Sequence, residues 1–166
     1  PRDVRGAVLA AVAAAKSPSL KKLLVCFAAP AREESARAVV NAVADASYTY
    51  TTTKSKPEGR TLSKVLVAIS NASEVQATFE RAVGVVSGVE MAKEWANRPA
   101  NHATPTLLAQ AAQELAQFPK ITCEVLGPKE VAKLGMGAFM AVAQGSDQPL
   151  RFVVLKYNGA AKTKAP

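Results

Sequence analysis

The sequence predicts an α/β protein, with a mostly parallel sheet flanked by helices, then a long connecting helix, then the opening elements of a second α/β domain. Apolar runs of strand length alternate with stretches of helical periodicity, the pattern of βαβ units. Hydrophobic residues make up 49% of the 166 residues and aromatics only 5%, which suits a helix-rich α/β protein. We expect an N-terminal domain over residues 1–72, a connecting helix over 73–97 and an incomplete second domain over 98–166.

Two helices are predicted in the first domain. Apolar residues at helical spacing predict a helix over residues 3–16, with Asp3 as its N-cap. Pro30 is expected to open a second helix that runs to about residue 46, because proline fits the first helical position. Its first turn carries Glu33 and Glu34, which the positive end of the helix dipole favours.

Three strands are predicted between and after these helices. Residues 22–28 and 65–69 are continuous apolar runs, typical of parallel strands buried on both faces. Residues 48–53 alternate tyrosine and threonine at first and continue with threonine, which predicts a half-exposed strand. Cys26 and Cys123 each lie in a predicted strand, and we expect both thiols to be buried and free.

A long helix is predicted over residues 73–96, with Ser73 and Gln76 forming a capping box at its start. It is apolar on more than one side, which predicts that it packs between two bodies. Gly84 and Gly88, four residues apart, are expected to allow close approach of another element. We interpret the helix as a rod between two domains.

The elements after residue 104 are shorter. Amphipathic spacing predicts a helix over residues 105–117, and alternation predicts a strand over 121–126. Two short helices are expected from Pro128 to Leu134 and over residues 136–143. A last apolar run over residues 151–157 predicts a buried strand.

Charge and apolar run length narrow the class of protein. The chain carries 21 Lys and Arg against 13 Asp and Glu, a net charge of +8, which permits nucleic-acid binding without requiring it. The basic residues are scattered, with one cluster over residues 54–60, so a solvated surface is favoured over a nucleic-acid face. No apolar run approaches about 18 residues, and no signal peptide precedes them. We expect no membrane span, a cytoplasmic location and a chain cut from a longer polypeptide.

Residue chemistry alone predicts no active site. His102 is the only histidine. We expect it to lie in a loop, with no other potential metal ligand at suitable spacing. Glu124 and Asp147 are isolated carboxylates, which we interpret as surface groups. Because no acid/base pair is present at useful spacing, no catalytic residue and no metal ligand is assigned.

One segment carries a recognisable motif. Pro99 forces the preceding helix to end at about residue 96 or 97, and Thr104 and Pro105 restart a helix as N-cap and first residue. The segment over residues 94–105 resembles the N-x-P-x-N-x-x-T-P signature of the leucyl aminopeptidase family, the M17 cytosol aminopeptidases. The signature positions, assigned a structural role, are Asn97, Pro99, Asn101, Thr104 and Pro105. Short motifs from residue 107 to 159 follow the order and spacing of that family.

The resemblance implies a metal-dependent leucyl aminopeptidase, which removes N-terminal amino acids from peptides and assembles as a homo-oligomer, usually a hexamer. Two divalent ions, manganese or zinc, would activate water there. The family's metal ligands are a lysine, three aspartates and a glutamate, and none of them can be matched to a position of this sequence. Lys162 and Lys164 are not assigned as the metal-binding lysine. We therefore expect residues 1–166 alone to be inactive and metal-free, and to serve in folding and oligomer assembly.

Two further expectations follow from the incomplete second domain and from the basic loop. Contacts between copies, or with a companion chain, are expected through Phe139, Met140 and the strand over 151–157, because an unfinished sheet leaves an unpaired edge. The alternative function is that of a DNA-binding or structural assembly module, with residues 54–60 of the N-terminal domain as the contact region.

Overall fold

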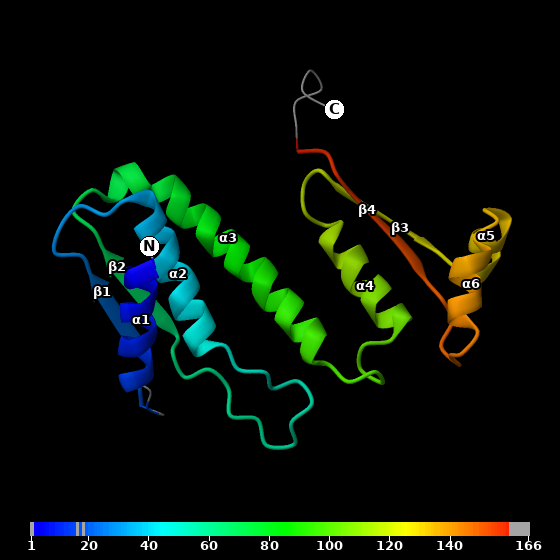
Figure 1. Ribbon diagram of the computed structural model, residues 1–166, viewed down its shortest axis with the longest axis horizontal. Helices are drawn as coiled ribbons and strands as arrows, with labels where there is room; N and C mark the ends of the chain where they lie inside the picture. The colour runs from blue at the N-terminus through cyan, green and yellow to red at the C-terminus, as the bar shows by residue number, and fades with distance from the viewer. Residues whose placement is uncertain (1, 16, 18, 160–166) are drawn as a thin grey trace. The chain divides into compact units, whose positions relative to one another are not determined.

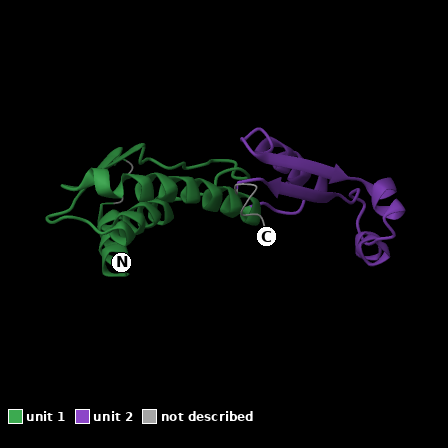
Figure 2. Cartoon of the chain, turned by 90° about the horizontal axis from the view of Figure 1, so that it is seen from above, with its two compact units in different colours: residues 1–97 green, residues 98–166 purple. Residues whose placement is uncertain are grey.

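The computed structural model describes residues 2–15, 17 and 19–159, and the chain divides into two compact units, residues 1–97 and 98–166 (Figure 2). Lys162 and Lys164 lie outside the described residues. The elements, labelled in Figure 1, are α1 (Arg2–Ala14), β1 (Lys22–Cys26), α2 (Glu33–Ser47), β2 (Lys64–Ala68), α3 (Ala72–Asn97), α4 (Pro105–Leu115), β3 (Ile121–Leu126), α5 (Pro128–Lys133), α6 (Gly137–Ala143) and β4 (Phe152–Tyr157). The predicted α/β class is confirmed.

The first unit is built on a parallel pair of strands, as predicted. β1 and β2 pair in register, with Leu24 opposite Leu66. The alternate side chains of both strands pack against a buried cluster contributed by α1 and α2, and this core consists of Val8, Val12, Val39, Ala42 and Val43. The sheet therefore buries one face against helices, as the alternation of a strand requires.

The other face of this sheet is exposed, so the prediction of strands buried on both faces is wrong for the described residues. Leu24 is 59% exposed and Leu66 is 49% exposed. Cys26 lies on the same face and is exposed as well, which corrects its predicted burial, whereas Cys123 in the second unit is partly buried. A continuous apolar run indicates that a strand could be buried on both faces, but the run does not determine whether a second layer covers the outer face.

The predicted strand over residues 48–53 is absent, and this segment is a loop. Its side chains are engaged with α3 instead of with a neighbouring strand. The Lys93 ammonium lies 5.2 Å from the centre of the Tyr48 ring, and the Thr52 hydroxyl donates a hydrogen bond to the Glu94 carboxylate. The alternation of tyrosine and threonine thus serves contacts with a helix, a use that strand propensity does not anticipate.

Three predicted helix starts are displaced. α1 begins at Arg2, which places Asp3 inside the first turn, and α2 begins three residues after Pro30, with Arg32 as N-cap. α3 begins at Ala72, so Ser73 is in its first turn and is not the cap.

The side chain of Asn71, the residue before α3, both accepts and donates hydrogen bonds. Its side-chain oxygen accepts a hydrogen bond from the Ala31 N–H at 2.9 Å, and its amide nitrogen donates to the Ala31 carbonyl at 3.1 Å and to Glu74 at 2.8 Å. These bonds join the loop after β1 to the start of α3. This tertiary contact displaces the start of α3 from the local capping signal.

α3 is 26 residues long, about 39 Å at 1.5 Å per residue. It packs on α2 within the first unit. Within the described residues Val75 and Ala82 are its buried positions, while Val83, Val85 and Val89 are exposed. A Cβ added at Gly84 or Gly88 would meet open space, so the predicted close approach of another element is wrong for the described residues.

The second unit pairs β3 with β4 in antiparallel fashion, with Cys123 opposite Leu155. The sequence predicts no strand orientation for this unit, and the parallel arrangement of the first unit does not extend to it. The short helices α5 and α6 lie beyond one end of the strands (Figure 1), so the connection reverses the chain instead of crossing back along the sheet. The predicted burial of β4 is only partial, because half of its residues are exposed. The ring of Phe139 in α6 packs edge-to-face on the ring of Phe152 in β4, with 5.6 Å between the ring centres.

Candidate functional site

The signature segment begins at the end of α3 and continues into the start of α4. α3 ends at Asn97, whose side-chain amide donates to the Lys93 carbonyl at 2.7 Å. Thr104 is the N-cap of α4, and its hydroxyl accepts from the Leu107 N–H at 3.3 Å, with Pro105 as the first helical residue. The predicted cap and proline positions are confirmed, and both follow from local rules.

The residues between these two helices form tight turns closed by backbone bonds. The Pro99 carbonyl accepts hydrogen bonds from the N–H groups of His102 at 2.8 Å and Ala103 at 3.0 Å. Asn101 and His102 are exposed. The structure thus gives two of the five signature residues, Thr104 and Pro105, a capping role, while the structural role assigned to the whole signature stays a prediction.

Metal-ligating chemistry is sparse in the described ranges. Within residues 2–15, 17 and 19–159, no three His, Cys, Asp or Glu side chains lie together as a cation site would require. Glu124 and Asp147 are exposed carboxylates far apart in sequence. The described residues therefore do not fit the two-metal centre that the family resemblance implies, because such a centre needs several oxygen or nitrogen ligands around each ion.

The most developed polar network lies in the first unit, where Asp45 of α2 bridges two other helices. Its carboxylate contacts the Arg5 guanidinium of α1 at 2.7 Å and the Lys93 ammonium of α3 at 2.6 Å. The hydrogen bond from Lys93, followed by that from Arg5, lowers the pKa of Asp45 below its usual 3.8. Asp45 therefore ties α1, α2 and α3 together at one end of α2.

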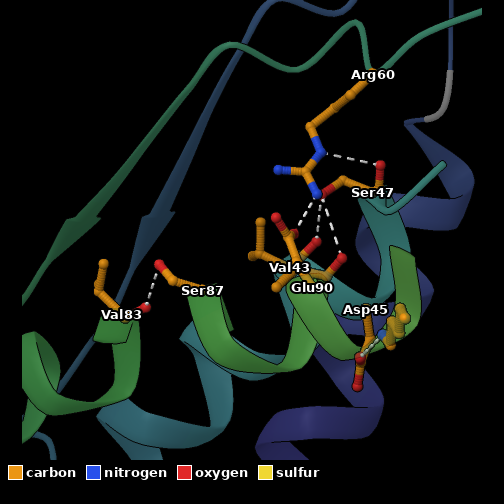
Figure 3. A network of polar contacts seen from close by, with 9 residues as sticks. Val43, Asp45, Ser47, Arg60, Val83, Ser87 and Glu90 are labelled. Carbon is orange, nitrogen blue, oxygen red and sulfur yellow. Dashed lines mark hydrogen bonds and ion pairs between the residues drawn. The ribbon is translucent and has the colours of Figure 1, made fainter. Parts of the chain in front are cut away.

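A second contact of this kind fixes the loop after α2. The Arg60 guanidinium pairs with the Glu90 carboxylate of α3 and donates to the Ser47 carbonyl at 3.1 Å (Figure 3). These partners are 13 and 30 residues away from Arg60 in sequence. No periodic pattern links such positions, so sequence reasoning missed both networks, and only the acidic and basic composition of the segments hinted at them.

The basic loop over residues 54–60 bears on the DNA-binding alternative. Arg60 already pairs with Glu90, which leaves Lys54 and Lys56 as the other cations of this loop. Nucleic-acid affinity arises from several phosphate contacts acting together. Since Arg60 is neutralised by a partner within the unit, the loop offers fewer charges to a phosphate backbone than its sequence indicates, and the alternative stays a prediction.

Among the residues that the structure describes, no helix combines the length and the apolar character needed to cross a bilayer.

Comparisons with known proteins agree with the motif. A profile described as the cytosol aminopeptidase family, catalytic domain, matches residues 90–166. Over these residues the chain is similar to the catalytic domain of the M17 peptidases.

The chain is also 62% identical over 164 residues to a probable cytosol aminopeptidase of Albidiferax ferrireducens, and 57% identical over 163 residues to one of an Acidovorax species. These matches cover 99% and 98% of this chain but 34% and 33% of the relatives. The chain thus spans about a third of the length of the curated relatives it matches.

Solved structures give the same fold. A tomato leucine aminopeptidase mutant matches with a TM-score of 0.85 at 28% identity, over 98% of this chain and 34% of that one. The bottromycin maturation enzyme BotP in complex with Mn matches with a TM-score of 0.78 at 28% identity, over 93% of this chain and 33% of that one. Both likenesses extend across the two units.

Proposed function

We propose that this chain provides the N-terminal α/β domain and the opening of the catalytic domain of a metal-dependent leucyl aminopeptidase, which removes N-terminal amino acids from peptides. The observation that carries the proposal is 62% identity over nearly the whole chain to a protein named as a probable cytosol aminopeptidase. The signature turn between α3 and α4 and the family match that begins at residue 90 support the same assignment.

Within that enzyme the described residues act in folding and assembly. Their polar groups are used in caps and interhelical ion pairs such as Asp45 with Lys93, and their carboxylates do not converge on a cation site. We infer that two divalent ions, manganese or zinc, are bound by residues of the longer polypeptide. A manganese complex of the structural neighbour BotP is compatible with this inference.

The proposal also extends to assembly and location. We propose that the enzyme works in the cytoplasm as a homo-oligomer, a hexamer by family resemblance. Phe139, Met140 and β4 remain the surface through which we expect copies or a companion chain to meet, since Phe139 and Met140 are only partly buried. Sedimentation of the longer enzyme with and without a charge at Met140 tests this expectation.

A chimera tests the function directly. Residues 1–166 replace the matching third of the Albidiferax ferrireducens protein, and hydrolysis of leucine p-nitroanilide is measured with added manganese. We expect turnover comparable with that of the unmodified relative, and the 166-residue chain alone should not exceed a metal-only blank. A folded chimera without turnover would contradict the proposal, as would hydrolysis by the isolated chain.

A further inference from the structure

The exposed side of the β1–β2 sheet is a defined surface, here called the open sheet face. Its six residues alternate with those that pack on the helices: Lys22, Leu24 and Cys26 from β1, and Lys64, Leu66 and Ala68 from β2. In register, a lysine pair, a leucine pair and a cysteine–alanine pair follow one another along the strands. The face is thus apolar along most of its length, with two cations at one end.

This arrangement is unusual for a parallel sheet. Parallel strands occur almost only in sheets covered on both faces, and continuous apolar runs are the mark of that burial. Here the inner residues Leu23, Val25, Val65 and Val67 pack on the core. Leu24 and Leu66, however, stay 59% and 49% exposed. Both strand sequences therefore suit a second layer, which the described residues of the first unit do not provide.

The size of the open sheet face distinguishes two candidates that could pack on it, a second copy of this chain and another segment of the same polypeptide. Five residues at about 3.3 Å rise, on two strands about 4.8 Å apart, make a footprint of roughly 16 by 10 Å. Two copies meeting through it would bury roughly 300 Å², far below the 1,200–2,000 Å² of stable interfaces. A segment of the same polypeptide needs no such area, because its effective concentration is already high.

The charged residues of the open sheet face indicate which side chains a covering segment would carry. Lys22 and Lys64 are opposite each other on neighbouring strands, and like charges so placed repel. A carboxylate above them would relieve that repulsion. Leu24 and Leu66 require apolar side chains beside it, since burial of apolar area is favourable.

We propose that the open sheet face is covered, in the whole protein, by a segment of the same polypeptide outside residues 1–166, which lays apolar side chains on Leu24 and Leu66 and a carboxylate near Lys22 and Lys64. The relatives are about three times as long as this chain, so they carry ample sequence for such a layer. The inference rests on the proposed function, which places this chain within a longer enzyme.

The exposed thiol of Cys26 reports on this cover. Maleimide labelling of Cys26, quantified on its peptide by mass spectrometry, is compared between the 166-residue chain and the chimera described above. We expect labelling at least about tenfold slower in the chimera, because a covered site reacts only through local opening. Equal rates in the two folded proteins would overturn the proposal. Urea-unfolded samples, which should label alike, serve as the control.

Paired substitutions separate cover from simple destabilisation. Leu24→Ser should leave the Tm of the 166-residue chain unchanged and lower that of the chimera by about 5 °C. Leu23→Ser, on the opposite face of the same strand, should lower both. No shift of the chimera on Leu24→Ser counts against the cover. If the chimera does not accumulate, hydroxyl-radical footprinting of the matching strand in the Albidiferax ferrireducens protein gives the same comparison.

Two outcomes keep this inference distinct from the proposed function. An active chimera with a freely reactive Cys26 refutes the covering segment and leaves the aminopeptidase assignment intact. An inactive, folded chimera with a protected Cys26 supports the covering segment and contradicts the aminopeptidase assignment. Sedimentation of the 166-residue chain tests the second-copy alternative. A dimer that Leu24→Ser dissociates would replace the proposed segment by another copy of this chain.

Discussion

Asp45 offers the sharpest test of how the first unit is held together. Its carboxylate pairs with Arg5 and Lys93, and the three side chains involved are between 34% and 50% exposed. Pairs this exposed are worth about 0.2–1 kcal/mol each. We expect Asp45→Asn, which keeps the shape and removes the charge, to lower the free energy of unfolding by about 1 kcal/mol at pH 7. For a unit of this size, that corresponds to about 4–8 °C in Tm.

The chain offers a selective probe for this measurement. Trp95 is its only tryptophan and lies in α3, so tryptophan fluorescence during thermal unfolding reports on this helix of the first unit. Glu58→Gln removes one negative charge from the exposed loop after α2 and serves as the matched control. If Asp45→Asn and Glu58→Gln unfold at the same temperature as the parent, the ion pairs contribute nothing measurable.

The same variant has a predicted pH dependence. The pKa of Asp45 is lower in the folded unit than its usual 3.8, chiefly through the Lys93 hydrogen bond. The carboxylate therefore contributes its full stabilisation above pH 3.8 and loses it as the pH falls below 3.8 through the folded value. The Tm difference between parent and Asp45→Asn should shrink over that window, and also in 1 M salt, where charges are screened within about 3 Å. A difference that persists unchanged at pH 2.5 would refute the electrostatic explanation.

Three further substitutions, two of them with a control variant, test local features. Thr104→Ala removes the N-cap of α4 and should cost about 1 kcal/mol, seen as faster hydrogen exchange at residues 106–108; Thr104→Ser should restore protection. Val39→Ala empties a fully buried site and should cost about 2 kcal/mol in urea unfolding. Val142→Ala, at an 85% exposed position, should stay within about 0.5 kcal/mol of the parent. Gly135→Ala, at a φ of +67°, should cost about 1 kcal/mol, and no loss there would disprove the backbone argument.

The features predicted well are those that local rules determine. The strand over 121–126 was located at its observed bounds, and the start of α4 followed from Thr104 and Pro105, because a cap and a proline act on their own backbone neighbours. The signature turn was found in the same way. Its position depends on adjacent residues and not on the fold around it.

The features predicted poorly depend on partners distant in sequence. Asp45 and Lys93 are 48 residues apart, and no periodicity connects them. The loop over 48–53 has strand-like composition, but its side chains contact α3. Whether β3 and β4 run parallel or antiparallel depends on the path of α5 and α6, which residue propensities do not encode. The exposed Leu24 shows the same limit, since apolar character indicates a need for burial and not its presence.

The two-way bonding of Asn71 has a consequence for where chemistry takes place. In parallel α/β sheets, small molecules commonly bind at the carboxyl ends of the strands, where loop backbone groups are free to receive them. Asn71 occupies that end of the β1–β2 pair and bonds both the N–H and the carbonyl of Ala31. The side-chain amide of Asn71 thus occupies one backbone donor and one backbone acceptor at this edge of the sheet, so neither group is left for a ligand.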